Sequence, residues 1–130
     1  MNKLMRPTAA AMAASFALAL STASLAVHAH GGAKPQHGGV VQTASDLSFE
    51  LVAQGTGAAL YIVDHGKPAD AGKFGGKLTV LHGAEKSEAE FKAAGSNKLE
   101  ATVTLGKGAK AVATLQLPGG KSTTVRFSFK

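Results

Sequence analysis

The chain has 130 residues with five histidines and no cysteine, so neither disulfides nor thiolate metal ligands are available. Its 14 basic residues exceed its 8 acidic residues, which gives a formal net charge of +6. The lysines are scattered and aromatic residues make up only 5% of the chain, so a nucleic-acid-binding surface is not expected.

The first 29 residues have the pattern of a secretory signal peptide. Lys3 and Arg6 form a basic start, an apolar run covers residues 9–20, and small residues follow. The apolar run is too short for a stable membrane span. We therefore expect a periplasmic protein without a membrane span in its mature form, in which 12 basic and 8 acidic residues leave a net charge of +4.

Two cleavage points fit the small residues that end this segment. Cleavage after Ala29 would make His30 the new amino terminus, whereas cleavage after Ala26 would leave Val27 there. With the first, residues 30–38 form a flexible arm rich in histidine and glycine, ahead of a single domain at 39–130. All three methionines fall within the removed segment.

Short apolar runs alternate with glycine-rich breaks through the rest of the chain. The first run alternates Leu47, Phe49 and Leu51 with polar Ser48 and Glu50, the period of two of a strand that has one buried face. Similar runs predict further strands, which in chain order are 58–65, 77–83, 88–94, 98–105, 111–117 and 123–129.

The breaks between these runs contain the residues that turns require. The PGG sequence at 118–120 predicts a hairpin between the last two strands. Seven or eight short strands in about 100 residues predict an all-β fold, an antiparallel sandwich or small barrel. Residues 84–94 could instead form a helical turn, although Phe91 alone gives it little to bury. We expect the domain to be a monomer.

The histidines carry the candidate chemistry. If cleavage exposes His30, its α-amine and its imidazole Nδ1 can chelate one metal ion, and His37 can add a third nitrogen across a flexible segment. Cu²⁺ suits such tetragonal nitrogen ligation. The alternative is that His30 is a tolerated residue and His37 a turn residue before Gly38 and Gly39.

His65 and His82 are further candidate ligands, because each ends a predicted strand just before a glycine. If both lie on one rim with His37, a surface metal site results. Asp64 and His65 would point to opposite faces unless the strand has already ended. The alternative for both histidines is a structural hydrogen bond within a turn.

An enzymatic function is not expected. There is no cysteine nucleophile, and none of the serines lies in a G-x-S-x-G context. The glycine-rich stretches lack the strand–turn–helix setting of a phosphate-binding loop.

Six segments recur in the same order in a group of small exported bacterial proteins, and the sequence resembles that group. A similar module begins some periplasmic adaptor subunits of heavy-metal efflux pumps. The segments are "HGGVV" (37–41), "DLSFELV" (46–52), "LYIVDHGKP" (60–68), "GKLTVLHG" (76–83), "AVATLQLPGGK" (111–121) and "VRFSFK" (125–130).

This resemblance implies a β-sandwich that takes part in copper, silver, zinc or cobalt handling, and it points to His37 and His65. The chain lacks tryptophan, and its mature form lacks methionine, which disfavours a soft Cu⁺ or Ag⁺ site. The expected function is binding of a divalent metal, Cu²⁺ or Zn²⁺, in efflux or resistance. The competing hypothesis is a metal-free module that docks on an efflux adaptor or another envelope protein.

Overall fold

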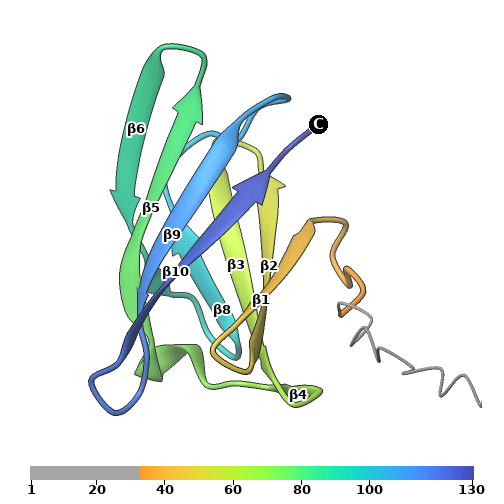
Figure 1. Ribbon diagram of the computed structural model, residues 1–130, viewed down its shortest axis with the longest axis vertical. Helices are drawn as coiled ribbons and strands as arrows, with labels where there is room; N and C mark the ends of the chain where they lie inside the picture. Colours follow the sequence, from red (N-terminus) through yellow and green to blue (C-terminus); the bar gives the residue numbers. More distant parts are fainter. Residues whose placement is uncertain (1–32) are drawn as a thin grey trace, which may run out of the picture.

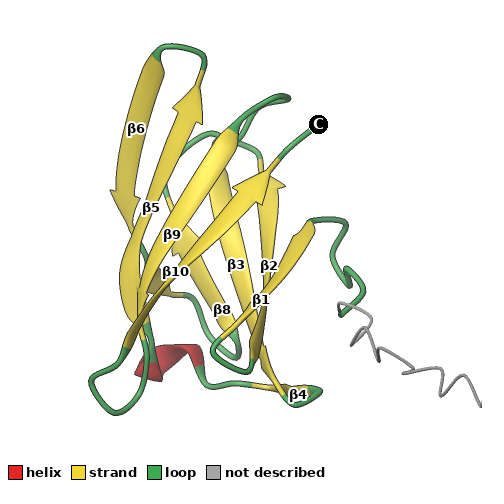
Figure 2. Cartoon of the chain, viewed as in Figure 1, coloured by secondary structure: helices red, strands yellow, loops and turns green. Residues whose placement is uncertain are grey.

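The computed structural model describes residues 33–130 and confirms the predicted all-β fold (Figure 1). One short 3₁₀ helix, η1 (Ala71–Lys73), interrupts the strands (Figure 2). The strands are β1 (Val40–Ala44), β2 (Leu47–Gln54), β3 (Gly57–Asp64), β4 (Lys67–Pro68), β5 (Gly75–His82), β6 (Glu85–Glu90), β7 (Lys92–Ala93), β8 (Lys98–Ala101), β9 (Lys110–Gln116) and β10 (Ser122–Ser128).

The strands form two antiparallel sheets that face each other as a sandwich (Figure 2). The first, sheet A, has the order β1-β2-β3-β8-β7, with β4 paired to β3. The second, sheet B, has the order β10-β9-β5-β6. The predicted signal peptide and His30 lie outside the described residues. Within 33–130 no helix is long and apolar enough to cross a membrane.

Tight turns join most neighbouring strands. Ser45 and Asp46 between β1 and β2 both have positive φ, as do His65 and Gly66 between β3 and β4. Two central residues with positive φ define the type I′ turn, whose twist matches that of the flanking strands. The predicted strand that contains His65 therefore ends one residue earlier, at Asp64.

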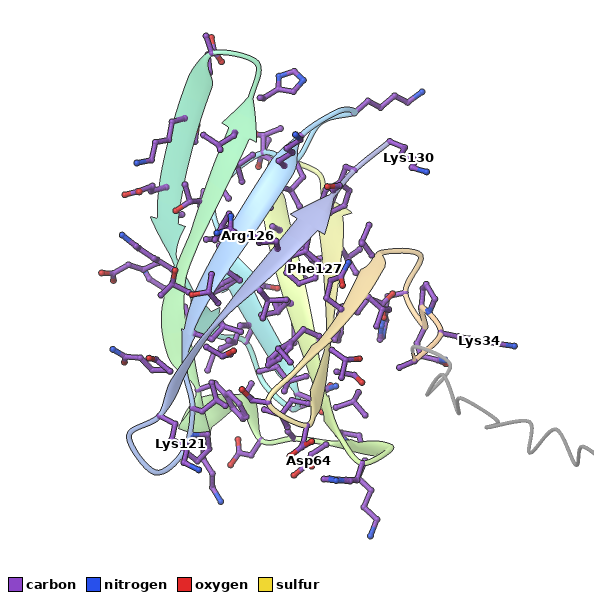
Figure 3. The ribbon with its side chains drawn as sticks, in the orientation of Figure 1. Lys34, Asp64, Lys121, Arg126, Phe127 and Lys130 are labelled. Carbon is purple, nitrogen blue, oxygen red and sulfur yellow. The ribbon has the colours of Figure 1, made fainter. Side chains whose placement is uncertain are left out.

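The core lies between the two sheets and follows the alternation seen in the sequence. Phe49 and Leu51 of β2 are fully buried, and Phe127 of β10 contributes to the same buried cluster from sheet B (Figure 3). Residues 99, 101, 103 and 105 are also buried, although β8 ends at Ala101. The period of two therefore continues beyond the hydrogen-bonded ladder.

Two further features differ from the sequence-based expectation. The helical alternative at 84–94 is wrong, because β6 and β7 occupy that segment, and Phe91 between them joins the core. The helix η1 was not expected. The side chain of Asp70 caps it by accepting a hydrogen bond from the Gly72 N–H at 3.0 Å, which is a common role for aspartate.

Candidate functional site

The site is built around Glu50, which is the one buried charged residue within 33–130. The alternation of β2 directs Glu50 to the outer face of sheet A, away from the core, yet its exposed fraction is only 6%. Glu50 is covered by residues 33–39, which precede β1 and which we call the amino-terminal arm. The arm passes over this face of the sheet, and Glu50 holds it there through hydrogen bonds.

Three backbone N–H groups of the arm donate hydrogen bonds to this carboxylate. His37 and Gly39 donate to Oε1 at 2.7 and 3.0 Å, and Gln36 donates to Oε2 at 3.0 Å. Close approach requires glycine at position 39, since a Cβ there would lie 2.3 Å from the carbonyl oxygen of Leu51. The HGG sequence therefore lets the arm dock on β2.

The imidazole of His37 completes the contact. Its Nδ1 lies 3.0 Å from Oε2 of Glu50, and its ring stacks on Tyr61 with centroids 3.6 Å apart and an interplanar angle of 4°. An ionised carboxylate can only accept, so Nδ1 carries the proton. The ring is held from one edge and one face, which leaves Nε2 as the nitrogen for a ligand. The side chain of His37 is 42% exposed.

These contacts keep Glu50 ionised. Burial alone would raise the pKa of Glu50, but hydrogen bonds from the His37 ring and from the backbone of Gly39, Gln36 and His37 together outweigh it and lower the pKa. A carboxylate that accepts several N–H bonds is stabilised in its charged form. The site therefore offers a fixed negative charge directly behind the imidazole.

A cavity of about 500 Å³ opens beside the arm on the outer face of sheet A. It joins the His37–Glu50 pair to the β3–β4 turn, and its lining mixes apolar and polar groups. The lining residues are Ala33, Lys34, Gln36, His37, Val41, Ser48, Glu50, Tyr61, Val63, Gly66, Pro68 and Asn97.

The other two histidines of the described region lie apart in the fold, His65 in a turn and His82 at the end of a strand. His65 occupies the β3–β4 turn, where its Nδ1 contacts the carboxylate of Asp64. In Figure 3, Asp64 is at the lower end of the view, whereas Lys34 of the arm lies higher and to one side. His65 and its neighbour Asp64 therefore pair with each other instead of pointing to opposite faces, because the strand has ended.

His82 closes β5 in sheet B, where its Nε2 lies 3.0 Å from the carbonyl oxygen of Lys107. A carbonyl oxygen only accepts, so Nε2 carries the proton and Nδ1 faces away from that bond. His37, His65 and His82 thus have three different partners. Within residues 33–130 no group of three or more His, Cys, Asp or Glu side chains is placed to hold a metal ion.

The comparisons with known proteins add no relative: no family model, no curated protein and no solved structure matches the chain. The site must therefore be interpreted from its own geometry. Sequence reasoning placed Glu50 on the solvent side of β2 and did not identify it as part of the site. The one signal was the HGG sequence at 37–39, whose small residues allow the backbone to approach a neighbouring strand.

Proposed function

We propose that the protein is an exported binding protein for a divalent transition metal, Cu²⁺ or Zn²⁺, in the periplasm. The folded domain supplies His37 as its ligand, coordinating through Nε2. The remaining nitrogen ligands come from the upstream segment, where His30 lies seven residues before His37. This function is linked to heavy-metal efflux or resistance, as the resemblance implies.

The observation that carries the proposal is the contact between Glu50 and Nδ1 of His37. Histidines that bind metals commonly donate their other ring N–H to a carboxylate, which fixes the tautomer and raises the basicity of the coordinating nitrogen. Glu50 does this from a buried position, and Tyr61 fixes the plane of the ring. Neither His65 nor His82 has a buried carboxylate behind its ring.

The donor set favours borderline metals. Imidazole and amine nitrogens suit Cu²⁺ and Zn²⁺, whereas Cu⁺ and Ag⁺ prefer thiolate and thioether sulfur. The chain has no cysteine, and its last methionine is Met12. A site with His37 as one ligand and the others in the segment upstream of it has to order a glycine-rich stretch of chain, which costs about 1–2 kcal/mol per residue fixed. We therefore expect moderate affinity.

The test is calorimetric titration of the mature protein with ZnCl₂ and CuCl₂, combined with NMR of the histidine rings. Two forms are compared, one beginning at His30 and one at Val27. We expect binding that shifts the ring signals of His37 and weakens at least tenfold in His37→Ala. His82→Ala is the matched control, because it removes an exposed histidine from the other sheet, and it should change the affinity less than twofold.

Two outcomes would refute this function. One is a mature protein whose histidine signals do not respond to either metal. The other is binding that survives His37→Ala unchanged, since the domain would then supply no ligand through this ring. A lower affinity for the form that begins at Val27 would assign the amino-terminal amine of His30 as a ligand.

A second candidate is a metal-free docking module for an efflux adaptor. The cavity beside the arm favours it, because Val41, Val63 and Pro68 give its wall an apolar character. This function predicts that binding of a purified adaptor is unchanged in His37→Ala and in the presence of a chelator, and is lost when Val63→Asp charges the cavity.

A further inference from the structure

Sheet B ends at β6, and this edge is exposed. None of the strands within 33–130 pairs with β6 on the side opposite β5. Five of its six residues are exposed, and only Ala89 is intermediate. Figure 1 shows the β5–β6 hairpin reaching beyond the neighbouring strands, with β6 on its outer side. An exposed edge of this kind is a template for pairing with another strand.

The register with β5 identifies which backbone groups face outward. His82 and Glu85 flank the two-residue loop and form a pair, and the Phe91 N–H donates to the Gly76 carbonyl at 2.9 Å. In an antiparallel ladder every second pair is hydrogen-bonded. The odd-numbered residues of β6 therefore bond to β5. Its even-numbered residues present their N–H and C=O groups at the open edge.

Two neighbouring even-numbered residues, Lys86 and Glu88, carry opposite charges, and Glu90 adds a negative charge at the end of the strand. The Nζ atom of Lys86 lies 3.3 Å from Oε1 of Glu88, and Nζ of Lys77 on β5 lies 3.9 Å from the same oxygen. The hydrogen bond from Lys86 and the charges of Lys77 and Lys86 lower the pKa of Glu88, so it is ionised at neutral pH. A strand that presents a cation two residues before an anion is complementary to an antiparallel copy of itself.

From this pattern we infer that β6 pairs with β6 of a second copy, in antiparallel orientation, about a two-fold axis at Ser87. Lys86 then lies opposite Glu88 of the partner subunit, Glu85 faces the partner's Ala89, and Ser87 faces its own copy. Two opposite-charge pairs result and no like charges meet, which is the arrangement that stabilises cross-strand pairs. The two four-stranded sheets become one continuous sheet.

Only this register both forms backbone hydrogen bonds at the open edge and places opposite charges across from each other. Moving the axis by one residue toward the turn places Lys86 opposite itself, and moving it by one residue the other way places Glu88 opposite itself. Like charges directly opposite each other are destabilising. Because edge pairing over six residues buries little surface, the dimer is of the weak, transient class, well below the roughly 1,200 Å² of stable interfaces.

Cysteine crosslinking tests the axis directly, because the natural chain has no cysteine to interfere. In a pair without backbone hydrogen bonds the Cα atoms lie about 4.5 Å apart, within the range of about 4.4–6.8 Å that a disulfide accepts. We expect Ser87→Cys to form a disulfide-linked dimer under mild oxidation. Thr124→Cys, an exposed residue in the middle of β10, is the matched control and should give at least fivefold less dimer.

Charge exchange tests the register. In the Ser87→Cys background, Lys86→Glu should lower the crosslinking rate at least fivefold, and Lys86→Glu with Glu88→Lys should restore it. Lys121→Glu makes the same change of charge in the β9–β10 turn and should have little effect. Circular dichroism of each variant confirms that the fold is kept, and a chelator in every sample separates this result from metal binding.

The inference is overturned if Ser87→Cys crosslinks no faster than Thr124→Cys. It is also overturned if the double exchange fails to recover the rate in folded protein. Sedimentation of the natural sequence gives a second measurement, with the average mass rising from monomer toward dimer as concentration increases. A mass that stays monomeric in the millimolar range contradicts the pairing.

Discussion

Replacing Glu50 with glutamine tests whether the buried carboxylate holds the amino-terminal arm. Each oxygen of Glu50 accepts two hydrogen bonds, from His37 and Gly39 on Oε1 and from Gln36 and the His37 ring on Oε2. Glutamine has one acceptor oxygen, which can keep the bonds from His37 and Gly39, and its NH₂ group can donate to Nδ1 of His37 if the ring takes its other tautomer. The change therefore removes the carboxylate charge and leaves the Gln36 N–H without its acceptor, while the shape of the side chain is kept.

The expected loss follows from the bond between the Gln36 N–H and the charged carboxylate. At about 1.5–3 kcal/mol for a hydrogen bond to a charged group, its removal lowers the free energy of unfolding by about 2 kcal/mol. For a domain of about 100 residues this corresponds to a fall in Tm of about 8–16 °C. Urea unfolding followed by circular dichroism at pH 7 measures the first quantity, and calorimetry measures the second. A difference below about 0.5 kcal/mol, the range of ordinary surface substitutions, would refute the anchoring role of Glu50.

The same variant should change how stability depends on pH. Because the pKa of Glu50 is lower in the folded protein than its ordinary value of 4.5, the unfolded chain binds more protons near that pH. The stabilisation is therefore complete above pH 4.5 and is lost as the pH falls through the folded-state pKa. Glu50→Gln removes this contribution, so its stability should fall less steeply on acidification. Parallel acid curves for the two proteins would contradict the lowered pKa.

Three further substitutions test the fold by urea unfolding. Gly76→Ala should prevent or severely impair folding, because a Cβ would lie 2.0 Å from the carbonyl oxygen of Thr114 and φ is +134°; a fully stable variant would contradict this strand contact. Phe127→Ala should cost about 3–5 kcal/mol, since the ring is 1% exposed; a loss near 1 kcal/mol would place it outside the core. His65→Gly should be neutral or stabilising by up to about 1 kcal/mol, because φ is +48° and the contact with Asp64 is exposed; a clear loss would give that contact a structural role.

The sequence predicts the strands well because one face of each is buried. The alternation around Phe49 and Leu51, and again from Leu99 to Leu105, marks the inner faces of the sandwich. Prediction from the sequence fails where a residue is buried by segments that are far from it in the chain. Phe91 lies between two strands, β6 and β7, with charged neighbours on both sides in the sequence, yet it belongs to the core cluster.

The candidate site was predictable only in part. His37 could be identified from its position next to two glycines, but the burial of Glu50 could not. A period of two assigns Glu50 to the solvent side, and the arm that covers it precedes β2 by about ten residues. The joint site of His37, His65 and His82 assumed that turn residues gather at one end. The described residues place these histidines in three separate settings, because β3 and β5 belong to different sheets.

The turns described above also have a consequence for how the chain reaches its fold. β1, β2 and β3 pair with their immediate neighbours through two-residue loops, as do β5 and β6. Such local hairpins form within microseconds. By contrast, β5 pairs with β9 and β3 pairs with β8, across about 30 to 40 residues. Forming these long-range pairs closes the longest loops and therefore costs the most chain entropy. We expect the joining of preformed hairpins to limit the refolding rate.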